Sequence, residues 1–276
     1  MLIDGRAIAR EITESLAHKV STLVERPLLS VFVLSSDAAT QQFIKIKKRT
    51  GESVGVDVRV LELPESTTTD ALVAHVREAV AVSNGIIVQL PLPAHIDFKK
   101  IQDTIPASHD VDGLGAEART RFENGDMSLL PPVVGACKEI LEHAGVDVAE
   151  KNAVVVGRGL LVGGPMATWL SHWGARVAVV ERGDTLEAYT HNADILVLGA
   201  GAPHVLKPNM IKDGVVILDA GTSEAGGKVV GDADPECAQK ASVMTPVPGG
   251  VGPIAIAMLF HNLLLCVKYQ SPEISE

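Results

Sequence analysis

A glycine-rich turn is the first stretch whose residues suggest chemistry. In VVVGRGLLVGGP, residues 154–165, an apolar β-branched run leads into glycines at positions 157, 159, 163 and 164, and residues 166–170 have the pattern of a helix. A strand, a glycine turn and a helix in this order can bind a phosphate, because bare backbone lets a pyrophosphate approach the amide donors at the positive end of the helix dipole. The spacing is GxGxxxGG and not the usual GxGxxG, so the turn alone fits dinucleotide binding and a plain tight turn equally well.

Charged residues near this turn bear on which dinucleotide it would hold. Glu181 ends the next apolar run, where a carboxylate can accept a hydrogen bond from a ribose hydroxyl and favour NAD. Arg158 in the turn and Arg182 beside the glutamate can instead pair with a ribose phosphate and favour NADP. If Glu181 pairs with one of the two arginines, the other still offers a positive charge to the ribose phosphate. We therefore expect NADP, with NAD as the alternative.

Residues suited to proton chemistry lie in the N-terminal half. Phe43 and Lys47 are four residues apart in one predicted helix, so their side chains leave the same face. A lysine whose pKa is lowered by burial can move protons near neutral pH, whereas an isolated lysine is more often a solvated surface charge. Gln89 follows an apolar strand, and its amide can hold such a lysine and polarise a reacting carbon, or merely cap a loop.

Two loops complete the set of candidates. In DVDG, Asp110 and Asp112 both offer carboxylates, although the segment can also be a simple turn. In TPVPGGVGP, residues 245–253, the glycines let backbone approach a flat ligand while the prolines stiffen the chain. The alternative for this second loop is that it is only the entry to a helix.

The elements that must position these residues alternate between strand and helix. Apolar runs typical of strands alternate with segments of helical spacing, which indicates an N-terminal doubly wound parallel α/β domain followed by a second, Rossmann-type nucleotide-binding domain. The first domain has predicted helices at 7–24, 39–54 and 69–82 and strands at 28–34, 56–63 and 85–90. The second has predicted strands that begin at 154, 176, 194 and 214.

The domain boundaries follow from this pattern. We place the catalytic domain at residues 1–138 plus 253–276 and the nucleotide-binding domain at residues 139–252. Residues 110–132 lack regular patterning and predict an irregular, partly functional loop region. Pro253 suits the first turn of an apolar helix at 254–267, which should return to the first domain and pack on it.

Composition limits the classes of protein. The chain has 276 residues, 46% of them hydrophobic and 3% aromatic, which suits two domains with aliphatic strands. A formal charge of −10 without a long basic stripe argues against a nucleic-acid partner. The three cysteines form no CxxC pair, so we expect neither a metal site nor disulfides. We find no signal-peptide core and no apolar stretch near the roughly 18 residues of a membrane span, so we expect a cytoplasmic protein with no membrane partner.

Four stretches together resemble one enzyme family. Lys47 in QQFIKIKK, Gln89 in VQLPLP, Asp112 in DVDG and the long TPVPGGVGP are similar to signatures of the methylenetetrahydrofolate dehydrogenase/methenyltetrahydrofolate cyclohydrolase family. The resemblance extends from IDGRAIA to HNLL, and VQLPLP and PVPGGVGP are its most specific parts. It implies oxidation of 5,10-methylenetetrahydrofolate with NADP and hydrolysis of the 5,10-methenyl product to 10-formyltetrahydrofolate. It also implies a homodimer that serves one-carbon metabolism and purine biosynthesis.

The resemblance implies roles for individual residues. Lys47, Gln89 and Asp112 would be catalytic, with Lys47 moving the proton and Asp112 accepting from the amide and amino donors of the pterin ring. The residues that would contact the substrate are Phe43, Pro248, Gly249 and Gly250. Those that would contact the cofactor are Gly157, Arg158, Gly159, Arg182 and Thr222, the last of these on the nicotinamide side.

The sequence departs from the family pattern at several of these positions. Phe43 stands where tyrosine is usual, His109 where lysine is common and Gly159 where serine is usual, and residues 114–134 lack the usual motifs. Because only the hydrolytic step relies on a tuned lysine, we expect the dehydrogenase to survive better than the cyclohydrolase. Two alternatives are an NADP dehydrogenase acting on another ring substrate, as in the shikimate dehydrogenase group, and a folate- or nucleotide-binding homologue that has lost catalysis.

Overall fold

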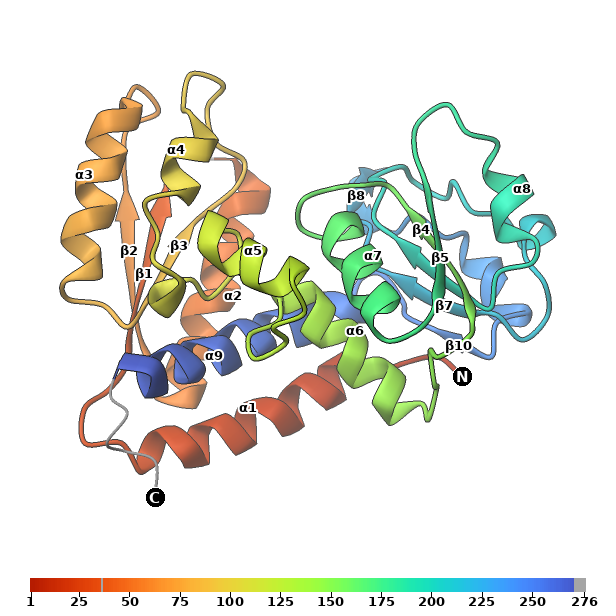
Figure 1. Cartoon of the computed structure of the whole chain (residues 1–276), viewed down its shortest axis with the longest axis horizontal. Helices are drawn as coiled ribbons and strands as arrows, with labels where there is room; N and C mark the ends of the chain where they lie inside the picture. The colour runs from red at the N-terminus through yellow and green to blue at the C-terminus, as the bar shows by residue number, and fades with distance from the viewer. Residues whose placement is uncertain (36, 271–276) are drawn as a thin grey trace. The chain divides into compact units, whose positions relative to one another are not determined.

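The computed structural model describes residues 1–35 and 37–270, which form two compact units (Figure 1). Unit 1 comprises residues 1–9 and 133–255, and unit 2 comprises residues 10–132 and the chain from 256 onward. The expected boundaries at 138/139 and 252/253 differ from these divisions, and the first nine residues group with the unit expected to bind the nucleotide. The end of the expected catalytic domain, 271–276, lies outside the described residues.

Unit 2 is built on a three-stranded parallel sheet in the order β2-β1-β3. The register pairs Leu28 with Asp57 and Leu29 with Gly85. The elements that contribute to this unit are α1 (Gly5–Ser21), β1 (Leu28–Val33), α2 (Ala38–Val54), β2 (Asp57–Glu62), α3 (Thr69–Val80), β3 (Gly85–Val88), α4 (Phe98–Gln102), α5 (Ala116–Glu123) and α9 (Val251–Gln270).

Alternating side chains of the central strand fill two separate cores. Val31 of β1 lies in one core with residues of α1, α2 and α9, while Phe32 lies in the other with residues of α3 and α4. Both faces of the sheet are therefore covered, as a parallel sheet requires. The inner strand β1 and the short strand β3 are almost entirely apolar for this reason, whereas β2 at one edge carries Asp57, Arg59 and Glu62.

Helix α2, which carries Lys47, has clear start and stop signals. The Asp37 carboxylate accepts a hydrogen bond from the Thr40 backbone N–H at 2.8 Å. The helix ends at Gly55, whose φ of 81° is left-handed backbone that suits glycine. These caps set the residues at which α2 begins and ends, with Lys47 in its interior.

Helix α9 corrects one expectation from the sequence. This helix of 20 residues is long and apolar enough to span a membrane by length and composition, with an 18-residue stretch whose mean hydropathy is 1.7 and of which 56% is buried. The expectation that no stretch reaches this length was therefore wrong. Leu259, Phe260 and Leu263 of α9 belong to the unit 2 core. A buried core helix can have the same length and hydropathy as a membrane span, because it is apolar on all sides.

A second correction concerns residues 110–132, expected to be irregular. Residues 116–123 form α5, a polar helix in which Phe122 is buried. Two ion pairs with i,i+4 spacing, Arg121–Glu117 at 2.6 Å and Arg119–Glu123 at 3.4 Å, support it. Apolar periodicity does not reveal a helix of this kind, because Phe122 is the one buried residue among its eight and no apolar stripe marks a face.

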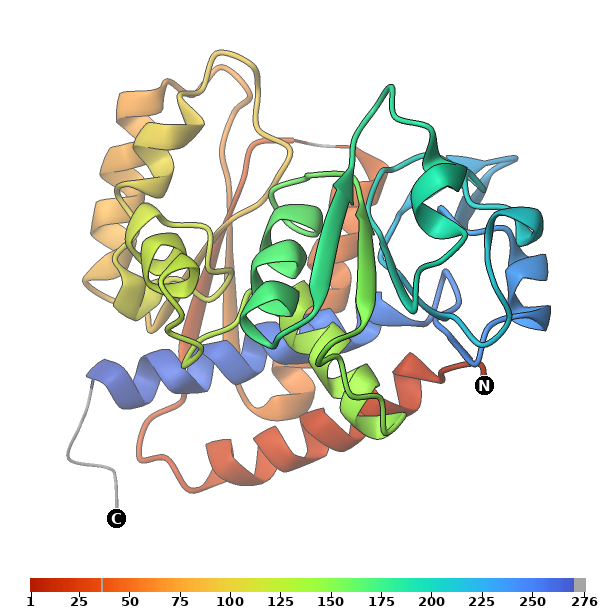
Figure 2. The ribbon, with the colours of Figure 1, turned by 45° about the vertical axis from the view of Figure 1, so that its right-hand side comes forward.

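Unit 1 contains a five-stranded parallel sheet in the order β10-β7-β6-β4-β5. Helix α7 packs against β4 and β5 (Figure 2). An antiparallel hairpin, β8–β9, was not expected from the sequence. The elements that contribute to this unit are α6 (Pro132–His143), β4 (Asn152–Val156), α7 (Gly163–His172), β5 (Arg176–Val180), α8 (Leu186–Thr190), β6 (Ile195–Leu198), β7 (Val216–Asp219), β8 (Ser223–Ala225), β9 (Lys228–Val230) and β10 (Val243–Met244).

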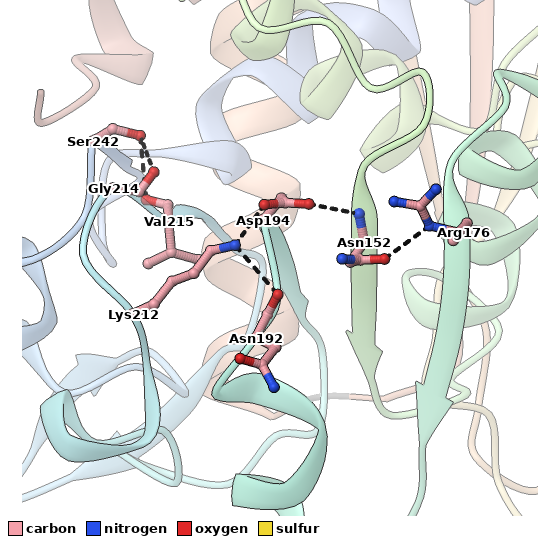
Figure 3. Close-up of polar contacts among 8 residues, drawn as sticks. All are labelled: Asn152, Arg176, Asn192, Asp194, Lys212, Gly214, Val215 and Ser242. Atoms are coloured by element: carbon pink, nitrogen blue, oxygen red, sulfur yellow. Dashed lines mark hydrogen bonds and ion pairs between the residues drawn. The ribbon is translucent and has the colours of Figure 1, made fainter.

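The amino ends of the unit 1 strands are joined by a polar network (Figure 3). The Asp194 carboxylate accepts hydrogen bonds from the Asn152 backbone N–H at 2.8 Å and from Lys212 Nζ at 2.5 Å. Arg176 Nε donates to Asn152 Oδ1 at 2.9 Å. These hydrogen bonds lower the pKa of Asp194, and the bond from Lys212 has a larger effect than the bond from Asn152. This network holds together the amino ends of the strands. Ligands of open parallel sheets bind at the opposite edge, at the carboxyl ends.

Candidate active site and cofactor turn

Lys47 and Gln89 meet in unit 2. Lys47 is 7% exposed, and its Nζ donates a hydrogen bond to Gln89 Oε1 at 2.6 Å. Gln89 directly follows β3, and its Nε2 donates to the Leu90 carbonyl at 2.8 Å. Both ends of the Gln89 amide are therefore engaged, which fixes the position of the Lys47 amine.

The electrostatics of Lys47 and Asp112 are coupled. Burial lowers the pKa of Lys47, and the charge of Asp112 raises it by a smaller effect. Burial raises the pKa of the Asp112 carboxyl, while Lys47 lowers it. Because burial dominates at Lys47, the neutral amine forms more readily there than at an exposed lysine, which is the state that a general base needs.

The segment that carries Asp112 is attached at several points. Asp110 is 1% exposed, and its carboxylate accepts from the Gly115 backbone N–H at 2.6 Å. Asn262 of α9 donates to the carbonyls of Val111 at 2.9 Å and Leu130 at 2.8 Å. Asp110, the competing candidate, is thus engaged within its own loop, and burial raises its pKa to about 6. Asn262 was not singled out from the sequence, where it appeared only within HNLL.

Phe43 lies one helical turn before Lys47 on α2. Its side chain is 42% exposed, so a large part of its ring is accessible. The structure therefore places Phe43, Lys47, Gln89 and Asp112 in one unit.

The glycine turn of unit 1 is tight at two of its glycines. Gly157 has φ of 93°, and a Cβ there would lie 2.7 Å from the Gly199 carbonyl oxygen. A Cβ at Gly163, where α7 begins, would lie 1.8 Å from the Gly157 carbonyl oxygen. At Gly159 the nearest such atom would be 3.9 Å away, so the serine usual in the family would fit at this position.

The charged residues near the turn form an exposed pair. Arg158 Nε donates to the Glu181 carboxylate, and the two side chains are 65% and 55% exposed. Arg182 follows β5 and is exposed. Thr222 is also exposed and lies three residues after the end of β7.

The segment Pro248–Gly250 belongs to unit 1, between β10 and α9. Gly249 has φ of 110°, and the Gly250 N–H donates to the Pro246 carbonyl at 2.8 Å. A Cβ on Gly5 would lie 1.9 Å from the Gly250 carbonyl oxygen, so backbone segments approach each other closely here.

The cysteines are buried thiols, and none of them belongs to a cluster of metal-binding side chains within residues 1–35 and 37–270. Cys137, Cys237 and Cys266 are free and buried, and burial raises the pKa of Cys137 to about 12. Within residues 1–35 and 37–270, no group of three or more His, Cys, Asp or Glu residues is placed to hold a metal ion.

Comparison with known proteins identifies the family. The family model described as "Tetrahydrofolate dehydrogenase/cyclohydrolase, catalytic domain" matches residues 3–112. The model described as "Tetrahydrofolate dehydrogenase/cyclohydrolase, NAD(P)-binding domain" matches residues 131–271. A "Bifunctional protein FolD" from Hydrogenobaculum sp. is 35% identical over 274 residues, covering 97% of this chain and 98% of that protein.

Solved structures agree with this result. The bifunctional enzyme FolD from Campylobacter jejuni has a TM-score of 0.94 at 35% identity, covering 98% of this chain and 99% of that chain. The Trypanosoma brucei FolD, complexed with NADP cofactor and inhibitor, has a TM-score of 0.93 at 32% identity, covering 98% of each chain. The resemblance and the two-domain α/β fold predicted from the sequence are confirmed. The chain belongs to the tetrahydrofolate dehydrogenase/cyclohydrolase family.

Proposed function

We propose that this protein oxidises 5,10-methylenetetrahydrofolate with NADP and hydrolyses the 5,10-methenyl product to 10-formyltetrahydrofolate. The observation that carries this proposal is the buried contact between Lys47 and Gln89, within the stretch that matches the family's catalytic domain. A buried amine held by an amide suits proton transfer to or from water at a reacting carbon.

The β4–α7 turn fits a dinucleotide. Gly157 and Gly163 leave room for backbone alone, so the pyrophosphate can approach the amide donors that open the ten-residue helix α7. Arg158 and Arg182 supply positive charge for a ribose phosphate, and Gly159 adds no side chain to obstruct it. NADP held at this turn would supply the acceptor for the hydride that leaves the methylene carbon of the substrate.

In the hydrolytic step, water adds to the methenyl carbon. The neutral amine of Lys47 takes a proton from this water as the new C–O bond forms, and the bond from that carbon to N5 then breaks. One of the two protons of the water ends on N5 and the other is released. Gln89 Oε1 accepts an N–H of Lys47, which directs the lone pair of the amine away from the amide.

The remaining site residues bind the substrate and the cofactor. Asp112 accepts from the donors of the pterin ring, because a carboxylate can accept two hydrogen bonds in parallel. The exposed ring of Phe43 stacks on the aminobenzoyl group, and Pro248, Gly249 and Gly250 let backbone approach the substrate. Thr222 contacts the nicotinamide side of the cofactor.

A second candidate is a dehydrogenase with a weakened cyclohydrolase. The observation that favours it is Phe43, which lacks the hydroxyl with which a tyrosine could support the lysine. A hydrolysis rate that matches or exceeds the oxidation rate would contradict this candidate.

One assay tests both candidates. Purified protein is given 5,10-methylenetetrahydrofolate and NADP, the absorbance of the methenyl product is followed, and acidification then converts the formyl product back to methenyl for counting. We expect NADP-dependent oxidation followed by formyl accumulation. If folate and NADP bind but no oxidation occurs, the chain is a binding homologue without catalysis.

We propose further that the protein is a cytoplasmic homodimer of one-carbon metabolism and purine biosynthesis, without nucleic-acid or membrane partners. Strand β5 lies at the edge of the unit 1 sheet, and Val177 and Val179 on it are only partly buried. Trp173, just before this strand, is 51% exposed. Apolar side chains beside an open strand edge suit pairing with a second copy. Light scattering on the eluting protein would give the mass of a dimer, and the mass of one chain would contradict it.

A further inference from the structure

Two buried aspartates at the carboxyl ends of the unit 1 strands take no part in the chemistry above. Asp219 is the last residue of β7 and is 2% exposed, and Asp232, which follows the β8–β9 hairpin, is 0% exposed. Burial of a carboxylate costs free energy unless hydrogen bonds satisfy its oxygens. The partners of these two side chains therefore indicate why they are buried.

Asp232 holds the segment that follows β6. Its Oδ2 accepts from the backbone N–H groups of Ala200 at 2.7 Å and Gly201 at 3.1 Å, and its Oδ1 accepts from that of Ala202 at 2.8 Å. Three successive N–H groups directed at one carboxylate fix the course of this loop, because each bond constrains the orientation of one peptide plane.

Asp219 holds the segments that follow β7 and the hairpin. Its carboxylate accepts from the backbone N–H groups of Gly221 at 3.0 Å, Asp232 at 3.2 Å and Ala233 at 2.8 Å. Its own N–H donates to Thr245 Oγ1, just beyond β10, at 2.7 Å. The two carboxylates thus accept six backbone hydrogen bonds and connect the loops that follow β6 and β7.

Two glycines make room for these carboxylates. A Cβ on Gly221 would lie 2.2 Å from Asp232 Cγ, and a Cβ on Gly231 would lie 2.2 Å from Asp219 Oδ2. The backbone at both positions is therefore packed directly on a carboxylate.

The sheet order tells which part of the cofactor these loops would face. Strand β4, with the pyrophosphate turn at its end, lies between β5 and β6. The charged pair that bears on the ribose phosphate, Arg158 and Glu181, lies on the β5 side of this turn. A dinucleotide that crosses the carboxyl ends of the strands must then place its nicotinamide on the other side, over β6 and β7.

We propose that Asp219 and Asp232 are positioning residues for the nicotinamide end of the cofactor site, because they hold the loops after β6 and β7 on which that ring lies. Thr222 directly follows Gly221. The Gly221 N–H donates to the Asp219 carboxylate, and the Gly221 backbone packs against the Asp232 carboxylate. This inference rests on the proposed function. Burial raises the pKa of Asp219 to about 6, its backbone hydrogen bonds oppose this shift, and the charge of Asp232 adds to it.

The test uses the two activities of the same full-length protein. In Asp232→Asn one acceptor oxygen becomes an NH2 group that faces backbone donors. We expect NADP-dependent oxidation to fall about tenfold or more in kcat/KM, with a raised KM for NADP. Hydrolysis of supplied 5,10-methenyltetrahydrofolate takes its proton chemistry from Lys47, Gln89 and Asp112 of unit 2, and neither carboxylate bonds to Pro248, Gly249 or Gly250, so this rate should stay within about twofold of the unmodified protein.

Two further variants keep the test decisive. Gly221→Ala retains both carboxylates but pushes on Asp232, and should give the same selective loss of oxidation. Asp234→Asn changes a nearby carboxylate that pairs with Lys207 at 3.1 Å, and should leave both activities unchanged.

The outcomes separate the possible failures. An equal fall of both activities with a lowered melting temperature would overturn the positioning role, as would unchanged oxidation in Asp232→Asn and Gly221→Ala. Absence of NADP-dependent oxidation in the unmodified protein would instead overturn the proposed function.

Discussion

Lys47 in unit 2 and Arg158 in unit 1 are both cations paired with a side chain that follows a parallel strand, yet their surroundings differ. Lys47 is 7% exposed and donates to a neutral amide, whereas the Arg158 side chain is 65% exposed and pairs with a carboxylate. Burial makes the charge of Lys47 costly and so makes its proton transferable. The exposed guanidinium of Arg158 is instead suited to pairing with an anionic group such as a ribose phosphate. The comparison therefore separates a residue suited to chemistry from one suited to cofactor selection.

The largest effect is expected at the buried cation. Lys47→Ala removes the amine that takes the proton from water, so hydrolysis of the methenyl substrate should fall by about 10²–10⁴-fold. Folate binding should remain measurable, because the other contacts stay. The matched control is Lys48→Ala, which changes an exposed lysine on the same helix and should retain the rate. Unchanged hydrolysis in Lys47→Ala would remove this lysine from the mechanism.

The pH dependence tests whether Asp112 tunes the same lysine. Hydrolysis should rise with pH as Lys47 loses its proton, with a midpoint below the ordinary pKa of lysine because of burial. The charge of Asp112 raises the pKa of Lys47, so Asp112→Asn should move this midpoint to lower pH, in addition to weakening substrate binding. The measurement is a profile of kcat/KM against pH for both proteins. A midpoint that stays in place or moves to higher pH would contradict the coupling.

The exposed pair should give a smaller effect, on selectivity. Glu181→Gln frees Arg158 from its carboxylate, so the ratio of kcat/KM for NADP over NAD should rise by about two- to fivefold, the range of an exposed ion pair. The effect should weaken with added salt, which screens exposed charges. Glu187→Gln, an exposed glutamate on α8, serves as the control and should not change the ratio. A fall in NADP preference on Glu181→Gln would mean that Glu181 does not restrain Arg158.

Most elements of both units can be predicted from the sequence, because buried parallel strands are mostly apolar and stand out between helices. The apolar pattern does not show α5, which buries only Phe122, or the β8–β9 hairpin, whose strands are only three residues each. The carboxylate of Asp232 could not be assigned from the pattern either. Its partners are backbone N–H groups about 30 residues earlier, and the side chains of those residues carry no sign of the contact.

The candidate site also depends on contacts between residues that are far apart in the chain. Lys47 and Gln89 are 42 residues apart in the chain, and no local spacing connects them. The sequence connects them only through the family resemblance. In the fold they meet because α2 and β3 both pack with β1. The pairing of Arg158 with Glu181 was open from the sequence, because either residue could have faced a ribose instead.

The smallest effect is expected at the amino ends of the unit 1 strands, where the polar network is structural. Lys212→Met removes the ion pair with Asp194, and the free energy of unfolding should fall by about 1 kcal/mol or less, because both side chains are partly exposed. The pKa of Asp194 is lowered in the folded protein, so this contribution is present above the ordinary pKa of an aspartate and is lost as the pH falls through the lowered value. Denaturant titrations at neutral and acidic pH should therefore show a difference between the two proteins that shrinks in acid. Both activities should stay at the level of the unmodified protein, since this edge lies opposite to the carboxyl ends that carry the cofactor turn. A selective loss of oxidation in Lys212→Met would mean that the amino edge also shapes the cofactor site, and the assignment of function to the carboxyl edge alone would be wrong.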